Sequence, residues 1–322
     1  MNREMTLARF LGSRRARLAF NVVSAVVAVG VGVLTTRHFV TNGWPLGHAK
    51  VLGVVSAGLL FLAAYGAKAL GWQLLFRAGK RPQTMALAAA GGAASVTGLA
   101  LPGRCDDVVR VAVVRRYPGH RCCVGSVCLS LFVLGLVEAA AMAPFASVAA
   151  GVAAPTGWLR AGLLVIAAAG VLAAAFVLAL PRLVHMPQVV RFRVVRWAHE
   201  HTTPPRDAMK AWVFVMLSWF LRMAAILVLL DALALDSSIP LALGFICASA
   251  AAAALPIAPG GAVAQLGAGA AILAAGGVHA SEAVAFSVAA QSLVVLAGGI
   301  VVVIATLTAL KDRVRRPANA VA

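Results

Sequence analysis

The chain has 322 residues, of which 62% are hydrophobic and 12% charged, and its formal net charge is +18. An average soluble domain is about half apolar and about a quarter charged, so a mean hydropathy of +0.94 excludes a water-soluble fold of this size. The arginines gather at the ends of apolar segments without stacking aromatic residues, which argues against nucleic acid as a partner. The composition predicts an all-α integral membrane protein, a polytopic helical bundle.

Six apolar stretches are long enough to cross a bilayer, whose hydrocarbon core of about 30 Å requires ~20 apolar residues per helix. They are 18–36, 51–76, 124–152, 159–180, 211–235 and 283–310. The first stretch follows a basic start and precedes no small-residue cleavage site. We therefore interpret it as a retained signal-anchor helix and not as a cleaved signal peptide.

Two further apolar stretches, 84–103 and 239–277, are interrupted by proline and glycine. Proline removes a backbone donor and glycine relaxes the chain, so both sites should break a helix. Non-helical backbone at membrane depth is tolerated only when it is buried in protein or lines a water-filled cavity. The residues that we expect to shape such a cavity are Pro102, Gly103, Pro259, Gly260 and Gly261.

The charges that flank the broken stretches predict the face from which each one enters. Basic residues lie on both sides of 84–103, whereas 239–277 follows Asp231 and Asp236 and precedes Glu282, with no Arg or Lys between them. By the positive-inside rule, the first stretch is a re-entrant hairpin from the cytoplasm and the second a hairpin from outside. The alternative for the second stretch is two short full crossings, 239–257 and 262–277.

The resulting order is helix, helix, hairpin, helix, followed by the same four elements upside down. Many transporters share such an inverted repeat. We expect a single transmembrane domain over 1–322, with half-repeats at 1–152 and 153–310 and a cytoplasmic tail at 311–322. The basic N-terminus, loop 182–210 and tail predict a multi-pass protein of the inner or plasma membrane, with both termini in the cytoplasm.

Ionisable residues inside the predicted spans are few. Glu138 and Arg222 each lie near the middle of a span, where a charge costs about 2.5–3.5 kcal/mol on insertion scales. Each should face the bundle interior, and we expect the two to pair. They form either a buried ion pair or a site in which Arg222 holds a lipid phosphate and Glu138 takes or releases a proton. Gln265 could supply a hydrogen bond to the headgroup.

Arg104 and Arg110 lie just past the first break, with Asp106 and Asp107 between them. If 108–115 is helical, Asp106 and Arg110 lie on one face and form a weak stabilising pair. Two adjacent acids with flanking arginines could instead bind Mg²⁺, but we favour a solvated cytoplasmic rim and expect no metal. The sequence has no Gly-rich phosphate loop and no nucleophile elbow, and we expect no cofactor.

At its two breaks the chain resembles the flippase-like transmembrane family of lysylphosphatidylglycerol synthase, taken as the membrane domain without the synthase domain. The family pattern at the first break is Leu-Pro-Gly-Arg, two variable residues, an acid, two apolar residues and Arg, which here runs from Leu101 to Arg110. At the second break the family has Pro-Gly-Gly followed by a Gly and a Glu. The resemblance covers roughly residues 15–310.

The chain departs from the family pattern at both breaks. Asp106 and Asp107 stand where the first motif usually has Gly-Glu, and Val263 and Leu266 replace the Gly and the Glu of the second motif. The acid-and-base signature expected near Ser130 is also lacking. If the family's acids couple or select a lipid, that step is lost or changed in this chain.

The resemblance implies movement or handling of an anionic or polyprenyl-type lipid, and no lysine transfer. Our leading hypothesis is a transporter-like protein, not an enzyme, that engages a membrane lipid phosphate through Arg104, Arg110 and Arg222. The first alternative is a polyprenyl-phosphate-linked glycosyltransferase-like enzyme with Asp106 and Asp107 as metal ligands. The second is a non-catalytic accessory subunit that positions a protein partner in envelope biosynthesis.

Overall fold

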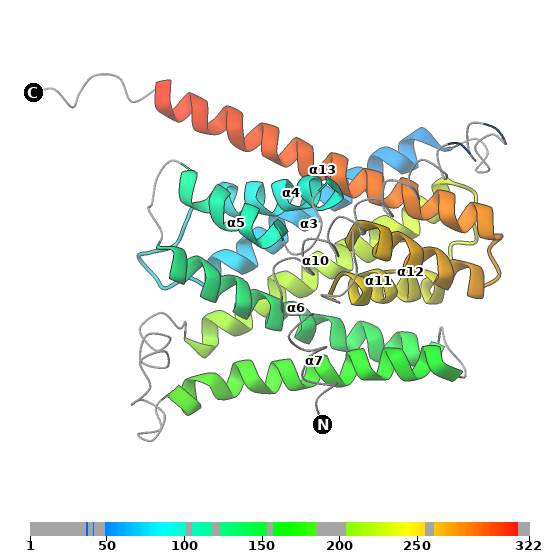
Figure 1. Ribbon diagram of the computed structural model, residues 1–322, viewed down its shortest axis with the longest axis horizontal. Coiled ribbons are helices and arrows are strands. Elements are labelled where there is room, and N and C mark those ends of the chain that lie inside the picture. Colours follow the sequence, from blue (N-terminus) through cyan, green and yellow to red (C-terminus); the bar gives the residue numbers. More distant parts are fainter. Residues whose placement is uncertain are drawn as a thin grey trace, which may run out of the picture.

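The computed structural model describes residues 37, 41, 49–100, 105–117, 123–152, 157–184, 204–254 and 261–314, and all regular structure in these ranges is helical. The predicted span 18–36 lies outside them. Figure 1 shows the helices gathered into one bundle. They are α3 (Val51–Leu74), α4 (Thr84–Ala100), α5 (Cys105–Arg116), α6 (Val124–Val152), α7 (Gly157–Val184), α10 (Pro205–Ala232), α11 (Ile239–Ala254), α12 (Gly261–Ala275) and α13 (Ala280–Val314).

Within the described residues, five helices are long and apolar enough to cross a membrane. Their apolar segments are Val51–Leu74, Val124–Val152, Arg160–Ala179, Pro205–Ala232 and Ala280–Lys311. These segments confirm the five predicted spans that lie between residues 51 and 310. The outer face of α7 exposes Val165 and Leu172, a surface suited to lipid and costly in water. The chain is an all-α polytopic membrane protein.

The helices α3 and α10 pack against each other in antiparallel directions along their whole lengths. At one end the backbone N–H of Lys50 donates to the carbonyl of Ala232 over 2.9 Å. Near the middle the Ser218 hydroxyl donates to the Ala64 carbonyl over 2.9 Å, and towards the other end Gly71 lies against the α10 backbone. Small residues let membrane helices approach this closely and gain packing contacts that lipid cannot supply.

The helices α4 and α13 cross at two glycines. A Cβ atom added to Gly92 would collide with the carbonyl oxygen of Gly298, so both positions require glycine for this approach. One turn away, the hydroxyl of Tyr65 on α3 lies 2.5 Å from Ser95 Oγ and 3.3 Å from the carbonyl oxygen of Val294. The pairing of 92 with 298 and of 95 with 294 shows that α4 and α13 are antiparallel.

The helices α4 and α5 form a hairpin whose connection, 101–104, lies outside the described residues. The hairpin starts beside the end of α3, where the Gln73 side-chain amide donates to the Pro82 carbonyl over 2.7 Å. It ends at Tyr117, whose hydroxyl donates to the Ala305 carbonyl over 3.2 Å. Since α13 is antiparallel to α4, Ala305 lies level with the start of α4. Both ends of this hairpin therefore lie at the same end of the bundle.

The second hairpin, α11 with α12, opens at the opposite end. Gly276 faces Leu241 and Gly269 faces Phe245, so the two helices are antiparallel with their outer ends together. Those outer ends adjoin the end of α10 and the start of α13, one helix length away from the start of α10. Figure 1 shows α4 and α5 in the left half of the bundle and α11 and α12 in the right half.

The first hairpin differs from the predicted one, because 84–100 is a single helix, α4, and the return leg is α5 (Cys105–Arg116). The opposite directions of the two hairpins agree with an inverted plan. The membrane face to which each open end belongs, the depth of each hairpin and the division into half-repeats at residue 152 stay predictions.

Candidate functional site: a charged cluster on α3, α5, α6 and α10

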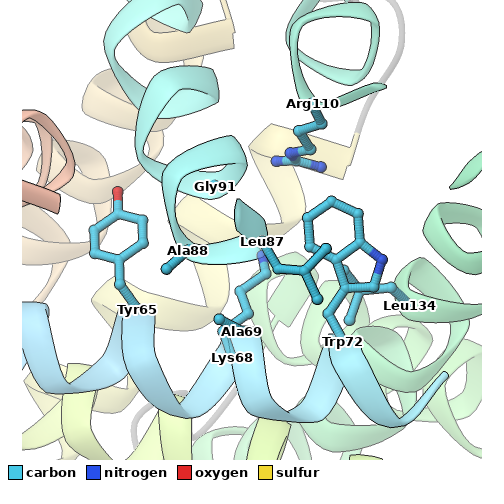
Figure 2. A pocket seen from close by; sticks show the side chains of 9 residues that line it. All are labelled: Tyr65, Lys68, Ala69, Trp72, Leu87, Ala88, Gly91, Arg110 and Leu134. Carbon is cyan, nitrogen blue, oxygen red and sulfur yellow. The ribbon is translucent and has the colours of Figure 1, made fainter. Parts of the chain in front are cut away.

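One face of α3 carries three side chains that combine an apolar body with a polar end: Tyr65, Lys68 and Trp72. Their spacing of three and four residues places them on the same side of the helix. Figure 2 shows this face turned towards α4, with Arg110 reaching down to it from α5. The face is largely removed from the surface, since Tyr65 and Trp72 are both buried.

Lys68 pairs with Glu138. The Lys68 Nζ atom lies 2.5 Å from Glu138 Oε1, and the two side chains are 19% and 25% exposed. Close by, the indole N–H of Trp72 donates to Ser130 Oγ over 3.0 Å. Lys68 and Trp72 are one turn apart on α3, and Ser130 and Glu138 lie on one face of α6. Two polar contacts therefore fix how α6 crosses α3.

The predicted pairing of Glu138 with Arg222 is wrong. Arg222 lies above the ring of Trp219, with its guanidinium carbon 5.0 Å from the ring centroid, in the geometry of a cation–π contact. No carboxylate of the described residues forms an ion pair with it. Its charge nevertheless acts on both Lys68 and Glu138. Glu138 on α6 pairs instead with Lys68, because the Lys68 side chain on α3 reaches the Glu138 carboxylate.

Arg110 is the third cation of the cluster. Within α5 its guanidinium pairs with Asp106 over 3.3 Å and with Asp107 over 3.0 Å, as expected for residues one turn apart. The helix predicted over 108–115 is confirmed. Arg110 also lines the cavity beside Lys68 and acts electrostatically on Lys68 and Glu138. The hairpin α4–α5 thus turns this arginine towards the interior of the bundle.

A small cavity lies among these helices. It is about 10 Å³ in volume, which is room for one water molecule. Its walls come from α3, α4, α5 and α6, and Figure 2 shows the residues that line it: Tyr65, Lys68, Ala69, Trp72, Leu87, Ala88, Gly91, Arg110 and Leu134. A lipid headgroup needs more space than this cavity offers.

The other predicted site residues divide into two groups. Pro102, Gly103, Arg104, Pro259 and Gly260 lie outside the described residues. The second group is on α12: Gly261 begins the helix, and the backbone carbonyl of Gln265 accepts a hydrogen bond from Ser249 over 3.5 Å. Among the described contacts, none joins Gln265 to the charged cluster. The structure therefore brings together Arg110, Arg222 and Glu138 and adds Lys68, which sequence reasoning missed.

A sequence signal for Lys68 was present. It is a basic residue inside the apolar stretch 51–76, three residues after a tyrosine and four before a tryptophan. Ionisable residues in membrane-spanning helices face the bundle interior and are functional candidates by default.

The cluster combines three cations, Lys68, Arg110 and Arg222, with the carboxylate of Glu138 and with the two aspartates that pair with Arg110. Arginine offers paired N–H donors to phosphate, and lysine offers a compact point charge. Charged groups of this kind can bind an anion electrostatically.

Residues 21–301 of the chain match the family described as the lysylphosphatidylglycerol synthase TM region. The chain belongs to this family. The match confirms the resemblance noted at the two proline–glycine breaks and covers every residue of the charged cluster. As a member of the lysylphosphatidylglycerol synthase TM region family with five apolar spanning helices among its described residues, it is a multi-pass membrane protein. No curated protein and no solved structure matches the chain.

Proposed function

We propose that this protein is a flippase-like carrier of the cell membrane that binds the phosphate-bearing headgroup of an anionic or polyprenyl-type lipid and moves it between leaflets. One observation carries the proposal: Lys68 pairs with the Glu138 carboxylate inside a membrane-spanning bundle, and the charges of Arg110 and Arg222, from two other helices, act on this pair. Both chain termini lie in the cytoplasm in this proposal.

The physical chemistry of the bilayer supports a binding role for these charges. Unneeded charges are costly at membrane depth, and those that remain mark substrate or ion pathways. The attraction between an anion and a cation is also stronger in a low-dielectric interior than in water. A phosphate that leaves water therefore loses hydration but gains several charged donors in the same place.

The two hairpins support movement as well as binding. Their open ends lie at opposite ends of the bundle, and inverted halves around a central site are a common basis of alternating access. Opening the α4–α5 hairpin on one side and the α11–α12 hairpin on the other would expose the cluster to each leaflet in turn. Arg104 joins Arg110 and Arg222 as a headgroup ligand in this proposal.

The first test measures lipid movement in liposomes that contain the full chain and a phosphatidylglycerol with a fluorescent acyl tail. Replacing Arg222 or Arg104 by alanine should slow transfer of the probe by about 10- to 100-fold, because a hydrogen bond to a charged group contributes about 1.5–3 kcal/mol. The matched control is Arg116→Ala, since Arg116 is exposed at the end of α5. Transfer at the wild-type rate in both site variants would remove their assigned role.

The glycosyltransferase-like alternative has no structural observation of its own. Its expected metal ligands, Asp106 and Asp107, both pair with Arg110.

A further inference from the structure

Glu138 is bound through one of its two carboxylate oxygens. Its buried Oε1 atom lies 2.5 Å from Lys68 Nζ in a charge-assisted ion pair. A carboxylate can accept several hydrogen bonds, and Lys68 is the one ion-pair partner of Glu138 among the described residues. The charges of Arg110 and Arg222, on two other helices, also act on the Lys68–Glu138 pair.

We propose that the Glu138 carboxylate occupies the position that a lipid phosphate group takes when it binds. The two anions then compete for one cation, the Lys68 ammonium group. This inference rests on the proposed function and identifies the chemistry of its site. In the closed state Glu138 neutralises Lys68. In the loaded state a phosphate oxygen replaces the carboxylate oxygen at Lys68 Nζ, and Glu138 turns away from it.

The surrounding cations make this exchange favourable. A phosphodiester spreads one negative charge over two non-bridging oxygens, which can contact different donors, whereas the described ion pair of Glu138 is with Lys68 alone. Arg222 has a π-face contact but no described carboxylate partner, so it can bind an incoming anion without giving up an ion pair. Arg110 lies at the wall of the same cavity as Lys68, and moving the α4–α5 hairpin would open that wall.

The cavity volume explains why exchange and not simple addition is required. The cavity beside Lys68 has room for one water molecule, so a phosphate cannot be added next to the Lys68–Glu138 pair without a rearrangement. The resident carboxylate thus lowers the apparent affinity for the lipid, because only the fraction of molecules with Lys68 released can bind it. Removing the carboxylate should raise that fraction to nearly all molecules.

The experiment measures equilibrium binding of a phosphatidylglycerol with a fluorescent tail to the full chain in detergent micelles. Glu138→Gln should lower the Kd by about fivefold or more, the low end of coupling between sites. Lys68→Met should raise the Kd by about tenfold, the loss of one charged hydrogen bond. The double variant Lys68→Met/Glu138→Gln should bind the probe as weakly as Lys68→Met. Glu138 competes with the lipid only for Lys68, and Lys68 is absent from both variants.

The matched control is Asp207→Asn. Asp207 pairs with Arg81 over 2.8 Å at the end of the bundle, and the side chains are 21% and 31% exposed, similar to the Lys68–Glu138 pair. This variant also loses a carboxylate from an ion pair, but away from the cavity, so its Kd should equal that of the wild type. A gain in affinity in Asp207→Asn as large as that in Glu138→Gln would overturn the proposal.

Three further ligands identify what is bound. A diacylglycerol with the same tails should not compete with the probe, because it lacks phosphate. Inorganic phosphate and glycerol 3-phosphate should compete weakly if the site takes a lipid, and as strongly as phosphatidylglycerol if it takes free phosphate. Competition by diacylglycerol equal to that by phosphatidylglycerol would show tail recognition only and would overturn the exchange.

A second measurement uses the wild-type chain, in case Glu138→Gln does not fold. A hydrophobic carbodiimide modifies carboxyl groups within the bilayer, and peptide mass spectrometry gives the extent of reaction at Glu138. Phosphatidylglycerol should increase modification of Glu138, since the side chain is released from Lys68, and diacylglycerol should not. Unchanged modification at saturating phosphatidylglycerol overturns the inference.

The two proposals fail in different ways. If the wild type moves phosphatidylglycerol in liposomes but folded Glu138→Gln binds it no more tightly, the exchange is wrong and the flippase-like function stands. If the wild type neither binds nor moves this lipid or any polyprenyl phosphate, the proposed function is wrong.

Discussion

Lys68, Trp72, Ser130 and Glu138 show how single residues at membrane depth can be both structural and chemical. Trp72 and Ser130 satisfy each other by one hydrogen bond, so neither is available for exchange without a loss. Lys68 and Glu138 satisfy each other by charge, and charge pairs can be broken by a competing ion. In the proposed exchange, the Trp72–Ser130 hydrogen bond is kept and the Lys68–Glu138 pair is broken.

Cys123, immediately before α6, allows a residue-scale test outside the membrane-spanning helices. Its Sγ atom lies 3.0 Å from Ser126 Oγ, and this hydrogen bond lowers the pKa of the Cys123 thiol from its ordinary value. A lower pKa gives more thiolate at a given pH, and the thiolate is the reactive form.

In a chain with the other cysteines replaced by alanine, the pH dependence of maleimide labelling should therefore shift. Ser126→Ala removes the hydrogen bond, raises the thiol pKa and slows labelling at neutral pH, and the midpoint of the rate profile moves to higher pH. Identical profiles for the two chains would show that Ser126 does not stabilise the thiolate.

At the scale of elements, glycine and alanine surfaces position the helices that carry the site. The crossing of α4 and α13 at Gly92 and Gly298 sets the place of the α4–α5 hairpin, and through it the place of Arg110. A change at the crossing should therefore affect both stability and the cavity, although no charge is altered.

Gly92→Ala tests this crossing. The added Cβ meets the Gly298 backbone, and overpacking of this kind costs about 1–3 kcal/mol, so the thermal midpoint of the purified chain should fall. Gly98→Ala on the same helix is the control, because nothing lies within 4 Å of its added Cβ, and its midpoint should stay at or above the wild-type value. Equal midpoints for the two variants would contradict the close approach.

Much of the element pattern was predictable from the sequence, because hydropathy and helix breakers act locally. The predicted spans at 51–76 and 124–152 coincide with α3 and α6 to within two residues at each end. The helix α4 ends at Ala100, directly before the Leu-Pro-Gly break, and α11 ends at Ala254, directly before the second break.

The partner of Glu138 was not predictable in the same way. Lys68 and Glu138 are 70 positions apart, and their contact depends on which faces of α3 and α6 meet, which no local pattern fixes. Likewise, Arg110 was predicted as a headgroup ligand, but the segment with its neighbouring acids was predicted at a solvated rim. Its place beside Lys68 arises because α5 folds back along α4.

For the whole molecule, the main prediction concerns the sides of the membrane. Single cysteines at Gln83 and Arg116 mark the two ends of the α4–α5 hairpin, and cysteines at Ser237 and His279 mark the ends of α11–α12; all four positions are exposed. In intact cells, a membrane-impermeant maleimide should label 237 and 279 only, and lysis should be required to label 83 and 116. Labelling of 83 and 116 from different sides would exclude the re-entrant hairpin.

The antiparallel pair of α3 and α10 has a consequence for any transport cycle. Lys50 pairs with Asp231 over 3.2 Å beyond one end, and Arg81 pairs with Asp207 over 2.8 Å beyond the other, with continuous packing between them. Lys68 and Arg222 both belong to this pair. In the proposed cycle they therefore keep their separation while the α4–α5 and α11–α12 hairpins move away from them on alternate sides of the bilayer.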